Sequence, residues 1–183
     1  MNVTADLDAQ FRAAAVAEGL VDVRYDVVAS PVGDLHVAAT GRGLCRISYR
    51  EDDWEERLAR GFGVRVLRSP LDEVRRELDE YFDGRRRSFD LPLDLRVAEF
   101  PAAVLHELAR VPYGQTDTYG KLAARAGRPR AARAVGTIMN RNPIPIVLPC
   151  HRIVGANGAL TGYAGGLDVK RRLLELEGAS FKA

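Results

Sequence analysis

The sequence predicts an α/β protein in two parts, an N-terminal part with a small antiparallel sheet and a mainly helical C-terminal part. Apolar and polar residues alternate over residues 21–49, which is typical of strands, and a helical period replaces this alternation after about residue 100. The charge reverses at the same point. Residues 1–100 hold 15 Lys and Arg against 20 Asp and Glu, whereas residues 101–183 hold 12 against 5. We therefore expect one domain over residues 1–97 and a second over residues 98–183.

The alternating segment divides into three strands, over residues 21–30, 35–41 and 44–49. Pro-Val-Gly-Asp and Gly-Arg-Gly separate them, and such turn residues between alternating segments predict an antiparallel meander. A short further strand is expected over residues 64–69.

Two helices are expected in the same part, over residues 52–63 and 69–84. The second has Ser69 as its N-cap, Pro70 at its first position and Gly84 after its end. Its apolar stripe is Leu71, Val74, Leu78, Tyr81 and Phe82.

Four helices are expected in the C-terminal part, over residues 101–111, 118–127, 128–142 and 167–178. Gly127 and Pro129 form a short turn between the second and third, which predicts a helix-turn-helix. The third helix combines small and basic residues, namely Arg128, Arg130, Ala132, Arg133, Ala134 and Gly136. This surface suits close approach to DNA with neutralised phosphates, but close packing against another helix would select the same alanines.

The cysteines and the N-terminus restrict the class of protein. Cys45 and Cys150 form neither a CxxC pair nor a disulfide framework, which favours a reducing compartment with free thiols. The first residues lack the apolar core of a signal peptide, and no apolar run approaches the roughly 18 residues that span a membrane. We expect a cytoplasmic protein.

The segment Pro-Cys-His-Arg, at residues 149–152, follows the apolar run of residues 144–148. Cys150 should therefore lie in or near an apolar pocket, where burial raises the pKa of a thiol unless a base or positive charge stabilises the thiolate. Adjacent residues of an extended chain face opposite ways, so His151 would reach Cys150 through a turn or a bridging water. A structural cysteine and a nucleophile both remain open at this point.

The wider segment decides between them by resemblance. The stretch "RAVGTIMNRNPIPIVLPCHRIVGANGALTGYAGGLDVKRRLLELEG" strongly resembles the O6-alkylguanine-DNA alkyltransferases, also called methylated-DNA–protein-cysteine methyltransferases. The segments "TYGKLA", "AARAVG", "NRNPIPI", "GYAGG" and "LLELEG" occur in the order of that family. The resemblance is close over residues 98–178 and rests on element order before them. It implies a ribonuclease-H-like N-terminal domain and direct reversal of O6-alkylguanine damage in DNA.

The resemblance also implies roles for the catalytic residues. Cys150 would attack the alkyl carbon and keep the group as a thioether, so that each molecule acts once. His151, through a bound water, would take the thiol proton, and Glu177 would hold the imidazole. Tyr119 would donate a proton toward guanine N3. Asn142 would tie the recognition helix to the active-site segment.

Further residues match the DNA-binding and alkyl-binding parts of the family. Arg133 would fill the stack vacated by a flipped nucleotide, on a helix that enters the minor groove. The remaining DNA contacts would come from Arg128, Arg130, Ala132, Ala134 and Gly136. The alkyl and base pocket would consist of Met139, Pro145, Tyr163, Ala164 and Gly165. Many members have serine where this chain has Ala164, so a side-chain hydrogen bond to O6 is missing here and backbone N–H groups would replace it.

No cofactor or metal is expected. Some members bind zinc in the N-terminal domain, but this domain offers only Cys45 and His36, too few for a structural tetrahedral site. The partner would be double-stranded DNA, bound by a monomer, with cooperative assembly on DNA left open. Two rival functions are a damage-binding protein without transfer, against which Cys150 argues, and a Cys-His hydrolase, which would leave the basic helix unexplained.

Overall fold

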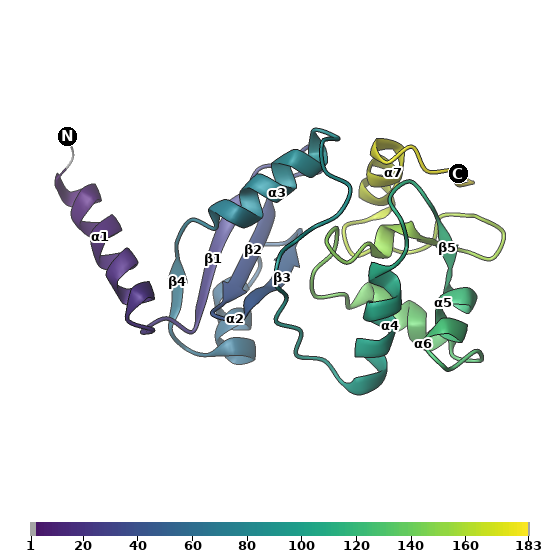
Figure 1. Cartoon of the computed structure of the whole chain (residues 1–183), viewed down its shortest axis with the longest axis horizontal. Helices are drawn as coiled ribbons and strands as arrows, with labels where there is room; N and C mark the ends of the chain where they lie inside the picture. The colour runs from purple at the N-terminus through teal and green to yellow at the C-terminus, as the bar shows by residue number, and fades with distance from the viewer. Residues whose placement is uncertain (1–2, 183) are drawn as a thin grey trace.

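The computed structural model of the chain describes residues 3–182 and contains a four-stranded sheet in its N-terminal half (Figure 1). Its strands are β1 (Val23–Val28), β2 (Leu35–Thr40), β3 (Gly43–Ser48) and β4 (Val66–Arg68), in the order β3-β2-β1-β4. β1, β2 and β3 pair antiparallel as predicted. β4 joins the other edge of β1 in parallel, so the complete sheet is mixed and not purely antiparallel.

A helix covers each face of this sheet. The buried side chains of β2 alternate, so that Val37 belongs to the main core and Ala38 to a smaller cluster with Trp54 and Leu58. The smaller cluster lies under α2 (Trp54–Phe62), and the main core lies under α3 (Asp72–Phe82).

The predicted start of α3 is wrong. The helix begins at Asp72, and Ser69 is not its N-cap, because the Ser69 N–H donates to the Tyr25 carbonyl and extends the pairing of β4 with β1. The carboxylate of Asp26, on β1, accepts from the Leu71 N–H at 3.3 Å. The sheet thus satisfies a donor at the helix start, where local sequence suggested a serine hydroxyl. Gly84 follows the helix with φ 72°, as predicted.

The C-terminal half is mainly helical, as predicted. It contains α4 (Glu99–Ala109), α5 (Tyr119–Arg125), α6 (Ala132–Asn140), a short 3₁₀ helix η1 (Cys150–Arg152) and α7 (Leu167–Leu176). The two-residue strands β5 (Asp117–Thr118) and β6 (Ile153–Val154) pair in parallel. Because α6 begins at Ala132, Arg128 and Arg130 lie in the turn before it and not on the helix.

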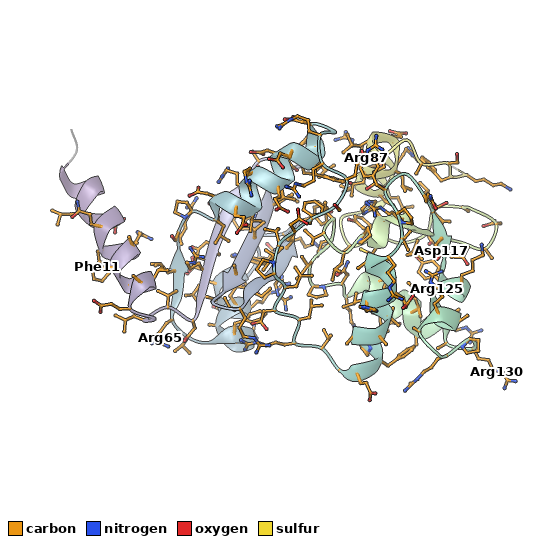
Figure 2. All side chains as sticks on the ribbon, viewed as in Figure 1. Phe11, Arg65, Arg87, Asp117, Arg125 and Arg130 are labelled. Atoms are coloured by element: carbon orange, nitrogen blue, oxygen red, sulfur yellow. The ribbon has the colours of Figure 1, made fainter. Side chains whose placement is uncertain are left out.

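An N-terminal helix, α1 (Val3–Ala17), extends the chain beyond the sheet, and nothing in the sequence analysis predicted it (Figure 1). Phe11 on this helix is 72% exposed and projects away from the body of the molecule (Figure 2). Arg12 reaches back to donate to the Arg68 carbonyl at 2.6 Å. No helix among residues 3–182 is long and apolar enough to cross a membrane.

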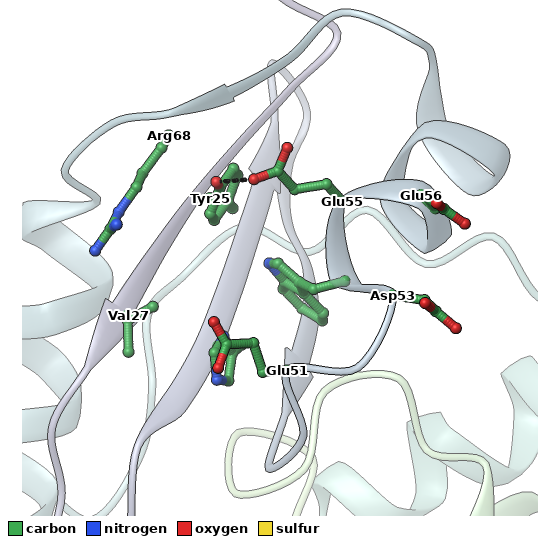
Figure 3. Close-up of a pocket in the computed structure, with 9 residues that line it drawn as sticks. Tyr25, Val27, Glu51, Asp53, Glu55, Glu56 and Arg68 are labelled. Carbon is green, nitrogen blue, oxygen red and sulfur yellow. Dashed lines mark hydrogen bonds between the residues drawn. The ribbon is translucent and has the colours of Figure 1, made fainter.

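A cavity of about 400 Å³ lies on the α2 side of the sheet, and Cys150 is not among the residues that line it (Figure 3). It is lined by acidic side chains at the start of α2, and Glu55 there accepts a hydrogen bond from Tyr25 on β1. Among the described residues, no group of three or more His, Cys, Asp or Glu side chains is arranged to hold a metal ion, in this cavity or elsewhere.

The two halves share one apolar core. It continues from the α3 face of the sheet to Leu105 and Leu108 of α4 and to Leu173 of α7. Backbone hydrogen bonds reinforce this contact: the Ile47 N–H of β3 donates to the Pro143 carbonyl at 2.9 Å. The edge of the N-terminal sheet therefore holds the segment that leads to Cys150.

Candidate active site

Cys150 lies at the end of a buried segment, as the apolar run predicted. Ile144, Ile146 and Leu148 are each at most 3% exposed, and Cys150 is 2% exposed at the start of η1. Ile146 has φ 76°, a conformation that a β-branched residue rarely adopts. The Leu148 N–H donates to the Ile144 carbonyl at 2.9 Å and closes a tight turn around this strained residue. The segment is thus folded into one fixed path toward the thiol.

His151 is fully buried and bonds to Glu177 at the end of α7. Its Nε2 lies 2.8 Å from Glu177 Oε1. A carboxylate only accepts hydrogen bonds, so Nε2 carries the ring hydrogen and Nδ1 carries the free lone pair. Nδ1 has no hydrogen-bond partner among residues 3–182, although it is buried. The ring therefore presents a free basic nitrogen, and no direct hydrogen bond to Cys150 occupies it.

Glu177 is the centre of a larger network, of which sequence analysis found only His151. Arg152 donates to both carboxylate oxygens, at 2.8 and 2.9 Å, and to the Val111 carbonyl at 2.6 Å. Tyr81 of α3 donates to Oε1 at 2.7 Å, and the Gly114 N–H donates to Oε2 at 3.3 Å. Every oxygen of the carboxylate is satisfied, so Glu177 is held by both halves of the molecule and cannot rotate freely.

The pKa values of the site follow from burial and from these bonds. The hydrogen bonds and charges of His151 and Arg152 outweigh the burial of Glu177 and lower its pKa to about 2. Burial lowers the pKa of His151, so the imidazole is neutral at pH 7. Burial also raises the pKa of Cys150 to about 11, against the smaller opposing effects of Asn142 and Lys170. The resting cysteine is a thiol and needs a base to react.

Lys170 is a buried cation that the sequence analysis missed. It is fully buried on α7, and its ammonium donates to the carbonyls of Ile153 at 2.5 Å and Thr161 at 3.0 Å. Burial lowers its pKa to about 8, while the negative charge of the Cys150 thiolate acts to raise it. The sequence could have identified it, because Lys170, Leu173 and Glu177 have the spacing of residues on one face of a helix.

Asn142 occupies the turn between α6 and the active-site segment. Its side-chain amide donates to the Leu148 carbonyl at 2.7 Å, and its oxygen accepts from the Ile144 N–H at 3.1 Å. These two bonds fold the segment of residues 142–148 back on itself. Both partners lie in the segment itself, and the tie between helix and segment that the resemblance implied for this residue stays a prediction.

Two tyrosines from other parts of the chain, Tyr119 and Tyr49, contact the segment of residues 161–166. The Tyr119 hydroxyl, on α5, lies 2.8 Å from the Thr161 hydroxyl. The Tyr163 hydroxyl lies 2.7 Å from that of Tyr49, which follows β3. Thr161 and Tyr49 were not identified from sequence, because both contacts join segments distant along the chain.

Only some of the residues expected to form the alkyl pocket line the same cavity. Pro145 and Ala164 line one cavity of about 440 Å³ together with Tyr49 and Asn142. Met139 is 3% exposed and belongs to the main core. The thiol itself is closed off, as its exposure of 2% indicates. A substituted base can therefore reach the thiol only if some of the side chains that cover it move.

The arginines expected to contact DNA lie on an exposed surface at α6 and the turn before it. No carboxylate of the described chain lies within ion-pair distance of Arg130, Arg133 or Arg141. Arg130 projects away from the molecule (Figure 2). Arg128 instead stacks its guanidinium on the Phe100 ring, 4.3 Å from the centroid.

The small residues of α6 have two different environments. Ala134 is exposed and Ala132 is half-buried. Gly136 faces the Tyr119 ring, because a Cβ at this position would lie 3.9 Å from it. Close packing therefore accounts for Gly136, whereas the approach of Ala134 to DNA stays a prediction.

Two family models match the chain. Residues 23–95 match the 6-O-methylguanine DNA methyltransferase, ribonuclease-like domain, and residues 99–179 match the 6-O-methylguanine DNA methyltransferase, DNA binding domain. The two matches cover most of the chain and meet close to residue 97, without overlap.

Individual relatives agree with these models. The chain is 42% identical to a methylated-DNA–protein-cysteine methyltransferase of Methanosarcina acetivorans, over 85% of this chain and 98% of the relative. It is 38% identical to the constitutive methylated-DNA–protein-cysteine methyltransferase of Bacillus subtilis, over 86% and 97%. The structure of Mycobacterium tuberculosis OGT in complex with DNA superposes with a TM-score of 0.76 at 39% identity, over 85% of this chain and 92% of that one.

Proposed function

The chain belongs to the 6-O-methylguanine DNA methyltransferase family, and we propose that it repairs O6-alkylguanine in double-stranded DNA by transferring the alkyl group to Cys150. The observation that carries this assignment of the nucleophile is the state of His151. Its Nε2–H is committed to Glu177, and its Nδ1 is buried with a free lone pair. That nitrogen belongs to the residue next to Cys150 and is free to accept a proton.

The transfer is a direct displacement. The Cys150 thiol loses its proton, through a bound water, to His151 Nδ1, and the thiolate attacks the alkyl carbon. A carbon–sulfur bond forms while the carbon–O6 bond breaks, and its electron pair stays on guanine. The resulting imidazolium is stabilised by the Glu177 carboxylate, which the charge of Arg152 and the hydrogen bonds from Arg152 and His151 keep ionised. Water does not hydrolyse a thioether, so the protein acts once.

The departing guanine needs a proton. Tyr119 is the proposed donor toward N3, and its bond to the Thr161 hydroxyl supports this role by fixing the orientation of the phenol. Lys170 supports the thiolate as a positive charge inside the same buried site.

DNA is the partner, since the chain belongs to a family with a DNA binding domain. The target carbon is inaccessible inside a duplex, so the nucleotide must be flipped out. We propose that α6 enters the minor groove and that Arg133 fills the position that the flipped nucleotide leaves in the base stack. The unpaired state of Arg130 and Arg133 supports their engagement by phosphates or bases. We propose a monomer in the cytoplasm as the active form, with the reduced state of Cys45 and Cys150 as support.

An intact-mass measurement after mixing with O6-methylguanine duplex DNA tests the assignment. We expect the mass of one methyl group per protein, mapped by peptide fragmentation to Cys150, and no further repair when fresh DNA is added. A damage-binding protein would show no mass gain, and a hydrolase would repair several guanines per molecule. A methyl group on Cys45 would overturn the choice of nucleophile.

A further inference from the structure

The N-terminal half reaches the segment of residues 161–166 through Tyr49. The Tyr49 and Tyr163 hydroxyls lie 2.7 Å apart, and the two rings meet edge to face with centroids 5.8 Å apart. Tyr49 also packs against the main core that contains Cys150. A single side chain of the sheet domain thus holds the aromatic residue that the family pattern assigns to the wall of the alkyl pocket.

The position of Tyr49 is fixed by the sheet. Ile47, two residues earlier, is 3% exposed in the core, and its N–H donates to the Pro143 carbonyl at 2.9 Å. Tyr49 is the first residue after the end of β3, and it packs against the same core as Ile47. The backbone bond that attaches β3 to the active-site segment therefore also sets where the Tyr49 ring lies.

Gly165 provides an independent observation of the same contact. A Cβ at this position would lie 2.9 Å from two atoms of the Tyr49 ring and 3.2 Å from the Tyr163 ring. Real Cβ atoms are rarely so close to a neighbour, so any other residue would displace one of the rings. The φ of Gly165 is not in the left-handed region, so the close approach to the rings, and not a turn, accounts for glycine here.

Tyr49 also borders a cavity that part of the expected alkyl pocket lines. It lines the 440 Å³ cavity together with Pro145 and Ala164, two residues of the expected alkyl pocket. The Tyr49–Tyr163 contact therefore lies beside this cavity and next to the closed thiol.

We propose that Tyr49 is a specificity-determining residue, which clamps Tyr163 and Gly165 and so limits the size of the alkyl group that reaches Cys150. The inference rests on the proposed function. A methyl group fits with the clamp intact, whereas a benzyl group requires the clamped segment to yield. The Tyr49–Tyr163 bond then contributes to the barrier for the large group alone, and it affects the ratio of the two rates more than the methyl rate itself.

The test compares Tyr49→Phe with the wild type on two free bases, O6-methylguanine and O6-benzylguanine, which require no base flipping. Removal of the hydroxyl keeps the ring against Gly165 and breaks the clamp. We expect the benzyl-to-methyl rate ratio to rise about three- to tenfold, the change that one net hydrogen bond produces. Tyr163→Phe should give a similar rise, and the double variant should not exceed the larger single effect, because both remove the same bond.

Tyr25→Phe is the matched control, because it removes a tyrosine hydroxyl bonded to Glu55 on the same domain but remote from the thiol. Its rate ratio should equal that of the wild type. An equal or lower ratio in Tyr49→Phe than in this control would overturn the inference. If the wild type itself gained no alkyl group from either base or from damaged duplex DNA, the proposed function would fail instead, and the two failures are therefore distinguishable.

Discussion

The buried network around Glu177 and the exposed face of α6 hold their charged side chains in opposite environments. At Glu177, one carboxylate accepts from Arg152, His151 and Tyr81, and all of these groups are buried. On α6 and the turn before it, Arg130 and Arg133 have no carboxylate partner in the described chain and lie in solvent.

The difference shows which part of the site is built before DNA binds. A buried carboxylate without its partners would be strongly destabilising, so the Glu177 network must be complete in the free protein. The exposed arginines are solvated by water, so they need no partner before they bind the phosphates of DNA. The catalytic network is therefore preorganised, whereas the DNA-binding surface finds its partners only when DNA binds. Substitutions in the network should reduce alkyl transfer, and substitutions on the surface should reduce the binding or repair of duplex DNA.

Cys150→Ala should give the largest separation between the two regions. Transfer should be abolished, because the variant lacks the thiol that we propose as the acceptor of the alkyl group. Affinity for damaged duplex DNA should stay within about a few-fold, since binding rests on the arginine surface. Intact mass and a gel-shift titration measure the two properties in one preparation, and any alkylated variant protein would refute the assignment.

Glu177→Gln should slow the single burst by about two or more orders of magnitude without changing its amplitude. The amide is neutral and cannot stabilise the imidazolium, although it still accepts one hydrogen bond. Tyr81→Phe is the milder comparison, because it removes one of the donors and keeps the charge. A rate for Glu177→Gln equal to that of the wild type would mean that Glu177 has only a structural role.

The same carboxylate should contribute to the acid sensitivity of the fold. The pKa of Glu177 is lowered from 4.5 to about 2 in the folded protein, so its contribution is fully present above pH 4.5 and is lost as the pH falls through 2. By pH 3 the wild type should lose about 2 kcal/mol of unfolding free energy from this group. Urea unfolding at pH 7 and pH 3 should show a correspondingly smaller loss for Glu177→Gln. Equal losses in both proteins would exclude the lowered pKa.

The contrast also explains how far the sequence could predict the molecule. The antiparallel strands, the helices α2 to α7 and the burial of Cys150 follow from local periodicity and were predicted, whereas α1 was not. The partners of Glu177 and Tyr163 were not, because Tyr81 and Tyr49 reach them across the two halves of the chain. The parallel pairing of β4 was not predicted, and the predicted start of α3 was wrong, for the same reason: both depend on contacts with β1. The roles of His151 and Glu177 came from resemblance; their distance of 2.8 Å came only from the fold.

On the exposed side, Arg133→Ala should weaken repair of duplex DNA about ten- to hundredfold, because unstacking a base requires a few kcal/mol that the inserted arginine offsets. Repair of the free modified base needs no flipping and should change little. The ratio of variant to wild-type rate on the two substrates, at one salt concentration, measures this. Equal ratios would show that Arg133 is an ordinary positive charge.

The smallest expected effects belong to Arg130 and Arg128, and they should differ from each other. Arg130 projects freely into solvent, so as a phosphate contact its replacement by Ala should lower the slope of log K against log salt by about one, evenly across sequences (Figure 2). Arg128 already stacks on Phe100 at 4.3 Å, and moving it to a phosphate would give up that contact. Arg128→Ala should therefore change the slope less than Arg130→Ala and lower the thermal stability slightly more. DNA titrations at several salt concentrations, together with thermal unfolding of both variants, make the comparison. If Arg128→Ala changes the slope as much as Arg130→Ala, the Arg128 guanidinium leaves the Phe100 ring when DNA binds. Arg128 would then be a phosphate contact like Arg130.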